Sequence, residues 1–416
     1  MSHHHHVTEL KDPGLFTAPR LKMASMVMVV LGVIGFIGAF FVGPNHGAER
    51  AWSILLQGML IPTYLSLAAL FFVCVHSIGG ARWVAPLRRL LESMSSGLPI
   101  TAVVFFLLAL PFLGGSYLYD WVNLSWNDVE GHPHTSLFHV YHGSKSGFMT
   151  WYRLLLTGTV FITGWLWLRY KLVGISLKQD VDGGCIRNIH RPWAIAYVMF
   201  FALSLTFFVW DMLLSLHVNW FSTMWGVYCF ASAMQTFLCV LLLLVLWLRR
   251  GPMKEHLPKH LLHDLGTWMV AWSCFCAYIG FSQFMLIYYA NLDEETYWYI
   301  LRTQHGWGLQ YWIEAVVRWP LPFLGLMSQK VRTNPVALLV ICSAVLVGNW
   351  MDWTWIIQPA MGINEYRGFY ALDLVLVGAG FAGGYLLLVQ AFWAKHGLVA
   401  KNDPDVLPVV NAEHLH

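Results

Sequence analysis

Ten long apolar stretches run through this 416-residue chain, and they leave few folds open to it. A helix needs about 20 mostly apolar residues to cross the hydrocarbon core of a membrane. Charged residues make up only 11% of the chain, against about 25% in an ordinary soluble protein. The sequence therefore predicts an all-α integral membrane protein with about ten transmembrane helices. The apolar segments are 23–42, 52–77, 99–118, 149–168, 193–217, 222–248, 265–290, 307–327, 335–357 and 369–393.

This composition also excludes several classes of protein. A soluble enzyme of this size needs far more charge to cover its surface, and so does a disordered scaffold. A net charge of +3, spread along the whole chain, is too small to indicate a nucleic-acid partner. We therefore expect the chain to contact lipid and other membrane proteins.

Lysine and arginine are distributed unevenly between the connections. The N-terminal tail (1–22), the even-numbered connections and the C-terminal tail (394–416) hold nineteen of them, whereas the odd-numbered connections hold four. Positively charged connections stay on the cytoplasmic side of a membrane. The distribution predicts that both termini face the cytoplasm.

A weak internal repeat is also present. FFVWDMLLSL around Asp211 and VGNWMDWTWI around Asp352 each place an aspartate close to tryptophan, in the outer half of a segment that leaves the cytoplasm. Repeated units of this kind are common in membrane proteins. Within a transmembrane domain of residues 23–393, we therefore predict two four-helix bundles, 52–217 and 222–357, with two peripheral helices.

Charged side chains inside a membrane cost several kcal/mol each, so each is a candidate for function. Glu314 and Arg318 lie one turn apart near the middle of the eighth segment, which is the least apolar of the ten. Other polar residues fall in the outer half or at the inner edge. Their distribution predicts a polar cavity that opens outward and a smaller polar inlet on the inner side. The candidate proton pathway consists of Asp211, Glu314, Arg318, Asp352, Asp264 and His76.

Structural interpretations compete with this pathway. Glu314 and Arg318 have the i,i+4 spacing of a pair that neutralises itself inside a bundle. Asp211 and Asp352 could instead form interhelical hydrogen bonds to Trp, Asn or Tyr. N-capping is the favoured account of Asp264, because this residue follows a basic connection at the expected start of a helix.

Cysteine and histidine give little support for a metal or a haem in this chain. The seven cysteines have no spacing typical of zinc, haem or iron–sulfur sites. A b-type haem needs two histidines at matching depth, but His76 and His217 fall at opposite membrane faces. The outer-loop histidines lack a cysteine or carboxylate to complete a metal site, so we interpret them as exposed loop residues. They are His132, His134, His139 and His142.

The last apolar segment contains the glycine-rich run VGAGFAGG (377–384). Small residues let two membrane helices approach closely. We interpret the run as a helix-packing face, suited to another membrane subunit.

Two long motifs resemble a known family. WDMLLSLHVNWFSTMWGVYCFA (210–231) is similar to the fifth-to-sixth helix corner of the ActF-type membrane subunit of bacterial alternative complex III. HDLGTWMVAWSCFCAYIGFSQFMLIYYANLDEETYWY (263–299) is similar to its seventh helix. The long aromatic loop after the third segment also fits. The resemblance extends over the whole chain, and more widely to the NrfD and polysulfide-reductase membrane subunits.

The resemblance implies a membrane subunit of a quinol:cytochrome c (or quinol:oxidase) oxidoreductase in the bacterial cytoplasmic membrane. Such a subunit has no redox centre of its own, and its role is structural or proton-conducting. The complex would use menaquinone or ubiquinone, and its c-type haems and iron–sulfur clusters would lie in partner subunits. The implied partners are an NrfD-like quinol-binding paralogue, a multihaem cytochrome c, an iron–sulfur/molybdopterin-like subunit and a terminal oxidase.

By position in these motifs, His217 lies in the helix corner, and Ser282 and Gln283 lie in the seventh helix. With Arg153, they are the candidates for contact with a quinone. Two alternatives stay open, namely a quinol-binding subunit in its own right and a stand-alone secondary transporter. Transporters break helices at their binding sites. Four prolines interrupt the segments here, but they do not occupy corresponding positions in the two halves of the chain. They are Pro62, Pro111, Pro320 and Pro322.

Overall fold

The computed structural model describes residues 13–41, 47–122, 147–184, 187–218, 220–304, 306–361 and 370–411. Helices dominate these ranges, and none of them contains a strand. Nine helices in this part of the chain are long and apolar enough to cross a membrane. The prediction of an all-α integral membrane protein is confirmed. The long aromatic outer loop with its four histidines lies almost wholly outside the described residues.

The first half of the chain contains five candidate spans, of which the third is built from several short pieces. They are α1 (Pro19–Ala39), α2 (Gly47–Gly79), the run from Ala85 to Ala109 that includes α3 (Arg88–Met94) and α4 (Leu98–Ala109), α8 (Trp151–Asp182) and α9 (Arg187–Met212).

The second half contains four candidate spans and several shorter helices. The spans are α10 (Trp225–Arg249), α11 (Lys259–Ala290), α16 (Pro335–Ile357) and α17 (Leu372–His396). The shorter helices of this half include α12 (Asp293–Thr303), α13 (Trp307–Arg318), α14 (Pro320–Gly325), α15 (Gln329–Arg332) and α18 (Val406–Asn411), and a further short helix, α5 (Ser116–Leu118), follows α4 in the first half.

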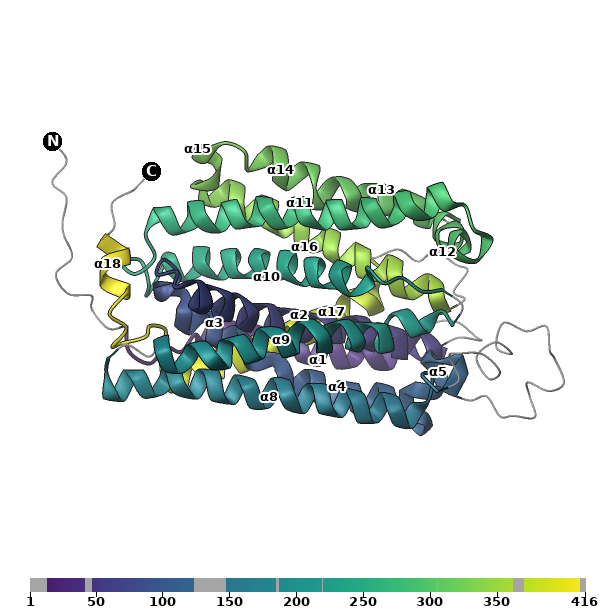
Figure 1. The fold of residues 1–416 in the computed structure, drawn as a ribbon, viewed down its shortest axis with the longest axis horizontal. Helices are drawn as coiled ribbons and strands as arrows, with labels where there is room; N and C mark the ends of the chain where they lie inside the picture. The colour runs from purple at the N-terminus through teal and green to yellow at the C-terminus, as the bar shows by residue number, and fades with distance from the viewer. Residues whose placement is uncertain are drawn as a thin grey trace.

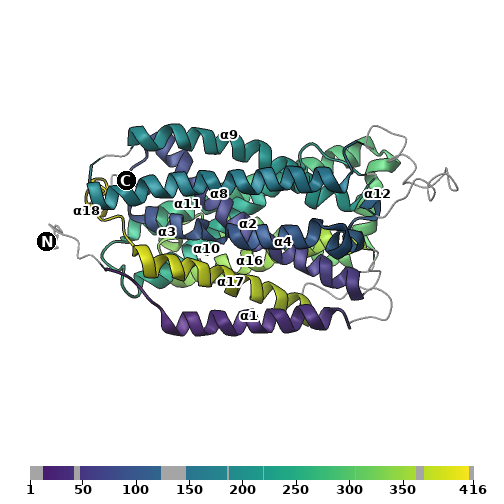
Figure 2. The ribbon, with the colours of Figure 1, turned by 90° about the horizontal axis from the view of Figure 1, so that it is seen from below.

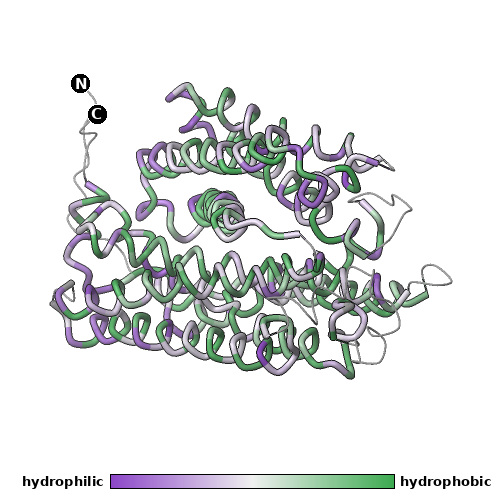
Figure 3. Tube along the Cα trace, turned by 45° about the vertical axis from the view of Figure 1, so that its right-hand side comes forward, coloured by the Kyte–Doolittle hydropathy of each residue, from purple (hydrophilic) through white to green (hydrophobic). Residues whose placement is uncertain are grey.

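The long helices run roughly parallel to one axis of an elongated bundle (Figures 1 and 2). The start of α1 and the short helix α18 lie at one end, which we term the inner end. Helices α5 and α12 lie at the opposite, outer end (Figure 1). Hydrophilic stretches gather mostly toward the two ends (Figure 3), as expected for a membrane protein.

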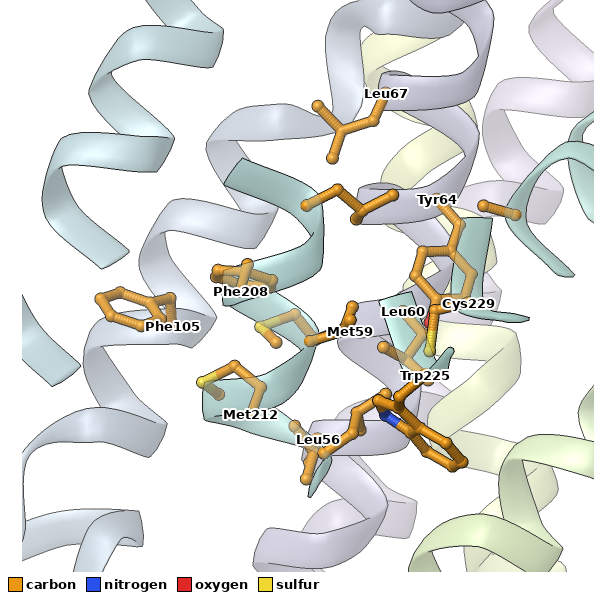
Figure 4. Packing of buried hydrophobic residues seen from close by; sticks show 14 of the residues in the cluster. Leu56, Met59, Leu60, Tyr64, Leu67, Phe105, Phe208, Met212, Trp225 and Cys229 are labelled. Atoms are coloured by element: carbon orange, nitrogen blue, oxygen red, sulfur yellow. The ribbon is translucent and has the colours of Figure 1, made fainter. Parts of the chain in front are cut away.

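Helix contacts divide the bundle into two groups. Helices α2, α4, α8 and α9 contact one another in sequence around a ring, and α10, α16, α13 and α11 do the same. Helix α2 also packs against α10 and joins the two groups. Figure 4 shows this junction, where Met59 and Tyr64 of α2 meet Phe208 of α9 and Cys229 of α10. The buried apolar core is therefore continuous between the groups.

The glycine run of α17 packs inside the chain and not against a partner subunit. A side chain on Gly32 of α1 would come within 2.5 Å of the Gly380 Cα in α17. A side chain on Gly378 would meet the Trp350 ring of α16. Because α1 and α16 cover this face, the expectation that it docks another subunit was wrong.

The third crossing begins at Ala85, well before the predicted start at residue 99. Arg89, which the sequence pattern places in a basic connection, is instead a fully buried residue of α3. Its guanidinium pairs with Glu92 at 2.5 Å and with Asp180 of α8 at 2.7 Å. The two carboxylates compensate its charge, which allows this arginine to be buried inside the helix bundle.

The eighth predicted span is a broken helix. Helix α13 ends at Arg318, and α14 begins at Pro320 after the non-helical residue Trp319. Proline has no N–H to donate and its ring crowds the preceding turn, so it interrupts a helix. This break explains why nine candidate spans are found among the described residues where ten were expected.

Candidate functional site

Helix α13 has its polar residues inside and its apolar residues outside. Its buried side chains include Gln310, Glu314 and Arg318. Leu309 and Trp312 face away from the bundle and are exposed. A soluble helix has the opposite arrangement, whereas a membrane helix can bury polar groups among neighbouring helices. The polar face of α13 therefore marks the centre of the second helix group.

Three charged residues meet on this face, and we term them the Glu314–Arg318–Asp352 cluster. Arg318 Nη1 lies 2.9 Å from a carboxylate oxygen of Asp352 in α16 and 3.9 Å from one of Glu314. The exposed fractions are 3% for Glu314, 7% for Arg318 and 0% for Asp352. The expected pair within α13 is therefore the weaker contact, and Arg318 pairs mainly with another helix.

Tyr228 of α10 completes the cluster. Its hydroxyl donates a hydrogen bond to Asp352 and accepts one from Arg318 Nη1 at 3.0 Å. The hydroxyl thus connects the cation to the carboxylate by a second path. Since two carboxyl groups share one guanidinium, a proton on Glu314 would bring the cluster to neutrality.

The break after Arg318 leaves a backbone carbonyl that needs a partner. In a continuous helix the Arg318 carbonyl would accept from the N–H four residues later, but that residue is Pro322. Gln235 of α10 takes that role, because its side-chain amide donates to the Arg318 carbonyl at 2.7 Å. Gln235 thereby fixes the end of α13, and with it the position of the guanidinium.

A large cavity adjoins the cluster. Its volume is about 670 Å³, and it lies between α11, α13 and α14 with Tyr228 of α10 on its wall. Glu314 and Arg318 also line it. The remaining lining is mostly apolar, and several lining residues are exposed on the side of the bundle. This cavity is therefore mostly apolar and opens toward the side of the bundle.

A second ion pair lies in the first helix group, at its outer end. Arg153, the third residue of α8, donates to the two oxygens of Asp211 at 2.6 and 3.2 Å. Thr157 donates to the same carboxylate at 3.1 Å. Arg153 also lies over the Phe148 ring. The Asp211 carboxylate is therefore paired with one cation, Arg153, and accepts hydrogen bonds from a guanidinium and from a hydroxyl group.

His217 connects the outer ends of the two helix groups. Its Nε2 accepts from Arg302 of α12 at 2.9 Å, and its Nδ1 lies 3.4 Å from the Tyr297 hydroxyl. Arginine can only donate, so the proton of this imidazole is on Nδ1. Burial, together with the neighbouring Arg302 cation, lowers the pKa of His217 to about 2. The imidazole ring is therefore neutral, and both of its nitrogens already face a partner, Arg302 on one side and Tyr297 on the other.

Arg302 is fully buried and holds the end of α16. Its side chain donates to the carbonyls of Trp355 and Ile356 at 3.0 and 2.7 Å. It also lies 3.7 Å from the centre of the Trp298 ring. The last carbonyls of a helix have no partner within it, and a cation satisfies them well. Burial lowers the pKa of Arg302 to about 9, which still leaves it charged at neutral pH.

The other candidate residues do not belong to the cluster, although Gln283 lies close to Tyr228. Gln283 is buried and lines a small space of about 30 Å³ beside Tyr228 and Tyr311, whereas Ser282 next to it is half-buried. His76, near the inner end of α2, forms a hydrogen bond through Nδ1 to the Phe72 carbonyl at 2.7 Å.

Asp264 is not the N-cap that the sequence suggested. Helix α11 begins at Lys259 with Pro258 before it, so Asp264 lies in the second turn. There its carboxylate is 3.3 Å from His263 Nδ1. The basic connection before Asp264 hid the true helix start, because its last residues are already helical.

Two important residues, Tyr228 and Gln235, were absent from the predicted site. They lie seven residues apart on α10 with Ser232 between them, and all three therefore share one helix face. Ser232 accepts a hydrogen bond from the Trp353 indole at 3.2 Å. This polar stripe was readable in the sequence, but a search for charged residues alone passes over it.

Within the part of the chain that the structure covers, no group of three or more His, Cys, Asp and Glu side chains lies close enough to hold a metal ion. No protein-family model and no curated protein matches this chain. The class of protein follows from the fold, which is that of an all-α integral membrane protein with several crossings. The cluster in its second helix group is the candidate site.

Proposed function

We propose that this chain is a membrane subunit of a quinol-oxidising respiratory complex, and that its second helix group carries protons through the Glu314–Arg318–Asp352 cluster. One observation carries the proton role: two buried carboxyl groups share a single buried guanidinium. Charge at membrane depth is costly, and where it occurs it often serves proton transfer.

The geometry gives the two carboxyl groups different roles. Asp352 is held by Arg318 at 2.9 Å and by the Tyr228 hydroxyl, so it stays ionised as the counterion. Glu314 is farther from the cation, at 3.9 Å, and one of its oxygens has no hydrogen-bond partner in the described residues. Glu314 is therefore the group that takes up and releases the proton, with water bridging the steps that side chains do not reach.

The motifs at 210–231 and 263–299 support membership of an alternative complex III type of assembly. In that assembly, haem c and iron–sulfur clusters belong to partner subunits, and this chain works beside an NrfD-like quinol-binding paralogue. The uneven lysine and arginine distribution supports a bacterial cytoplasmic membrane with both termini inside. Purification tests this part, because a chain that never copurifies with multihaem and iron–sulfur subunits contradicts it.

Substitution tests the proton role in the intact complex, reconstituted in liposomes. Glu314→Gln preserves the shape of the side chain but cannot ionise. We expect it to lower the number of protons moved per electron while assembly and electron transfer are preserved. Asp211→Asn tests the first helix group separately, since it alters the aspartate there that corresponds to Asp352. Proton movement that is unchanged in Glu314→Gln rejects the proposal.

A secondary transporter is the second candidate, and the break between α13 and α14 favours it. Transporters commonly unwind a helix where substrate and coupling ions bind. Here the break falls directly beside the charged cluster. Solute uptake by liposomes that contain only this chain would support the transporter over the respiratory subunit.

A further inference from the structure

The cavity beside the cluster has the size and position of a ligand site. Ligand pockets typically measure about 300–1,000 Å³, and this one is about 670 Å³. The most exposed of its lining residues, on the side of the bundle, are Tyr278 at 67%, Trp312 at 65% and Phe281 at 62%. The side of a membrane protein faces lipid, so a ligand would enter from the membrane and must dissolve in it.

The walls of the cavity favour a flat ring. Aromatic residues from four helices dominate its lining, with Tyr228 of α10 among them, and aromatic faces pack well against other rings. The main contributors are Tyr278, Phe281 and Phe284 of α11, Tyr311 and Trp312 of α13, and Phe323 of α14.

The polar end of the cavity has a donor and an acceptor that lack partners. Glu314 Oε2 and Arg318 Nη2 make no hydrogen bond to any described residue, and both residues line the cavity. An unsatisfied buried polar atom costs about 1–3 kcal/mol. A single hydroxyl group can satisfy both, because it accepts from the guanidinium and donates to the carboxylate.

The charges at this end disfavour an ionised head group. A phosphate would meet the Glu314 carboxyl group, and Arg318, the one cation among the described lining residues, is already paired with Asp352 at 2.9 Å. An ammonium group would meet Arg318 itself. A neutral head group avoids both repulsions.

We propose that this cavity binds a neutral, membrane-soluble molecule with a hydroxyl-bearing flat ring, and that its hydroxyl lies between Glu314 and Arg318. An isoprenoid quinol and a polycyclic lipid alcohol both have this chemistry. The assignment rests on the proposed function, since the ligand would meet the same Glu314 carboxyl that carries the proton.

Binding to the full chain in lipid nanodiscs tests the assignment, with heptyl hydroxyquinoline N-oxide as a fluorescent probe. We expect saturable binding of one probe per chain. Ala315→Trp fills the cavity and should weaken binding by about tenfold or more, the loss expected when a ligand and its hydrogen bonds are displaced. Ala202→Trp, on the exposed face of α9, is the matched control and should bind as the unaltered chain does.

A second cavity variant guards against misfolding. Ala277→Phe narrows the cavity from α11. The probe affinity of each cavity variant is interpreted only if its thermal unfolding midpoint is close to that of the unaltered chain. Equal probe affinity in Ala315→Trp, Ala277→Phe and Ala202→Trp overturns the proposal. Competition then separates the two sources: displacement by a short-chain naphthoquinol supports a quinol, displacement by cholesterol supports a lipid alcohol, and displacement by neither overturns the site.

The proton and binding tests can fail separately. Probe binding that is lost in the cavity variants, combined with unchanged proton movement in Glu314→Gln, supports the ligand site and rejects the proton role. Normal probe binding in all variants, combined with a lower proton yield in Glu314→Gln, supports the proton role and rejects the ligand site.

Discussion

The two helix groups each contain an arginine–aspartate pair on corresponding helices, but they place it differently. In the first group, Arg153 and Asp211 lie near the helix ends, and the arginine side chain is 19% exposed. In the second group, Arg318 and Asp352 lie deeper and are almost fully enclosed. The repeat that the sequence hinted at around the two aspartates thus extends to their partners.

Charge balance distinguishes the two regions further. One cation faces one carboxylate in the first group, whereas one cation faces two carboxyl groups in the second. A pair of one cation and one carboxylate near water is already neutral, so it gains little from binding a proton. A buried cluster with one carboxyl group in excess gains from binding a proton and can release it when its surroundings change. Depth and an extra glutamate therefore convert a structural pair into a candidate proton site.

Removal of the aspartates should give the largest difference between the regions. Asp352→Ala leaves the buried Arg318 without its closest carboxylate, and breaking a buried pair costs about 3–5 kcal/mol. Asp211→Ala leaves Arg153 able to reach water, so its cost should be about 1 kcal/mol or less. Thermal unfolding of the two purified variants in one detergent compares them. Equal shifts in the unfolding midpoint would contradict the difference in depth.

Removal of the hydroxyl donors should give a smaller difference in lost stability between the two helix groups. Tyr228→Phe deletes the hydroxyl that bridges Arg318 and Asp352, which should cost about 1–3 kcal/mol, because buried charged groups lose a partner. Thr157→Val deletes a donor to Asp211, whose two contacts to Arg153 persist, and should cost about 1 kcal/mol or less. The same unfolding assay applies. A larger effect of Thr157→Val would reverse the assignment of the stronger network.

Acid should have the smallest effect on stability. It acts through His217, the residue that connects the outer ends of the two helix groups. The pKa of His217 is lowered to about 2 in the folded chain, against about 6.5 in an unfolded one. The unfolded chain therefore binds the proton first, and the stability that neutral His217 confers is present above pH 6.5 and declines as the pH falls below it. At pH 5.5 the loss should be about 1 kcal/mol.

His217→Gln tests this pH dependence. Glutamine can still accept from Arg302 but does not titrate, so its unfolding midpoint should fall less between pH 7 and pH 5.5. Parallel curves for the variant and the unaltered chain would show that His217 does not contribute.

Some of the site was readable from sequence, because charges stand out in apolar segments. Glu314, Arg318, Asp211 and Asp352 were all found in this way. Their partners were not, since helix spacing suggested that Arg318 pairs with Glu314, and only packing brings Asp352 closer. Buried pairs near helix ends were also missed. Arg50 is one of the four basic residues that the sequence pattern places in the odd-numbered connections, yet its guanidinium binds both oxygens of Asp373 at 2.5 and 2.8 Å.

The sequence by itself determined that this chain is a helical membrane protein, because length and apolarity of a segment are local properties that decide whether it can cross a bilayer. Tertiary structure alone decided which charges share a cation, which glycine face is covered and where a cavity opens. Those outcomes depend on contacts between helices far apart in the chain, which no local pattern specifies. The excess carboxyl group at Arg318 is such an outcome, since it needs α10, α13 and α16 together.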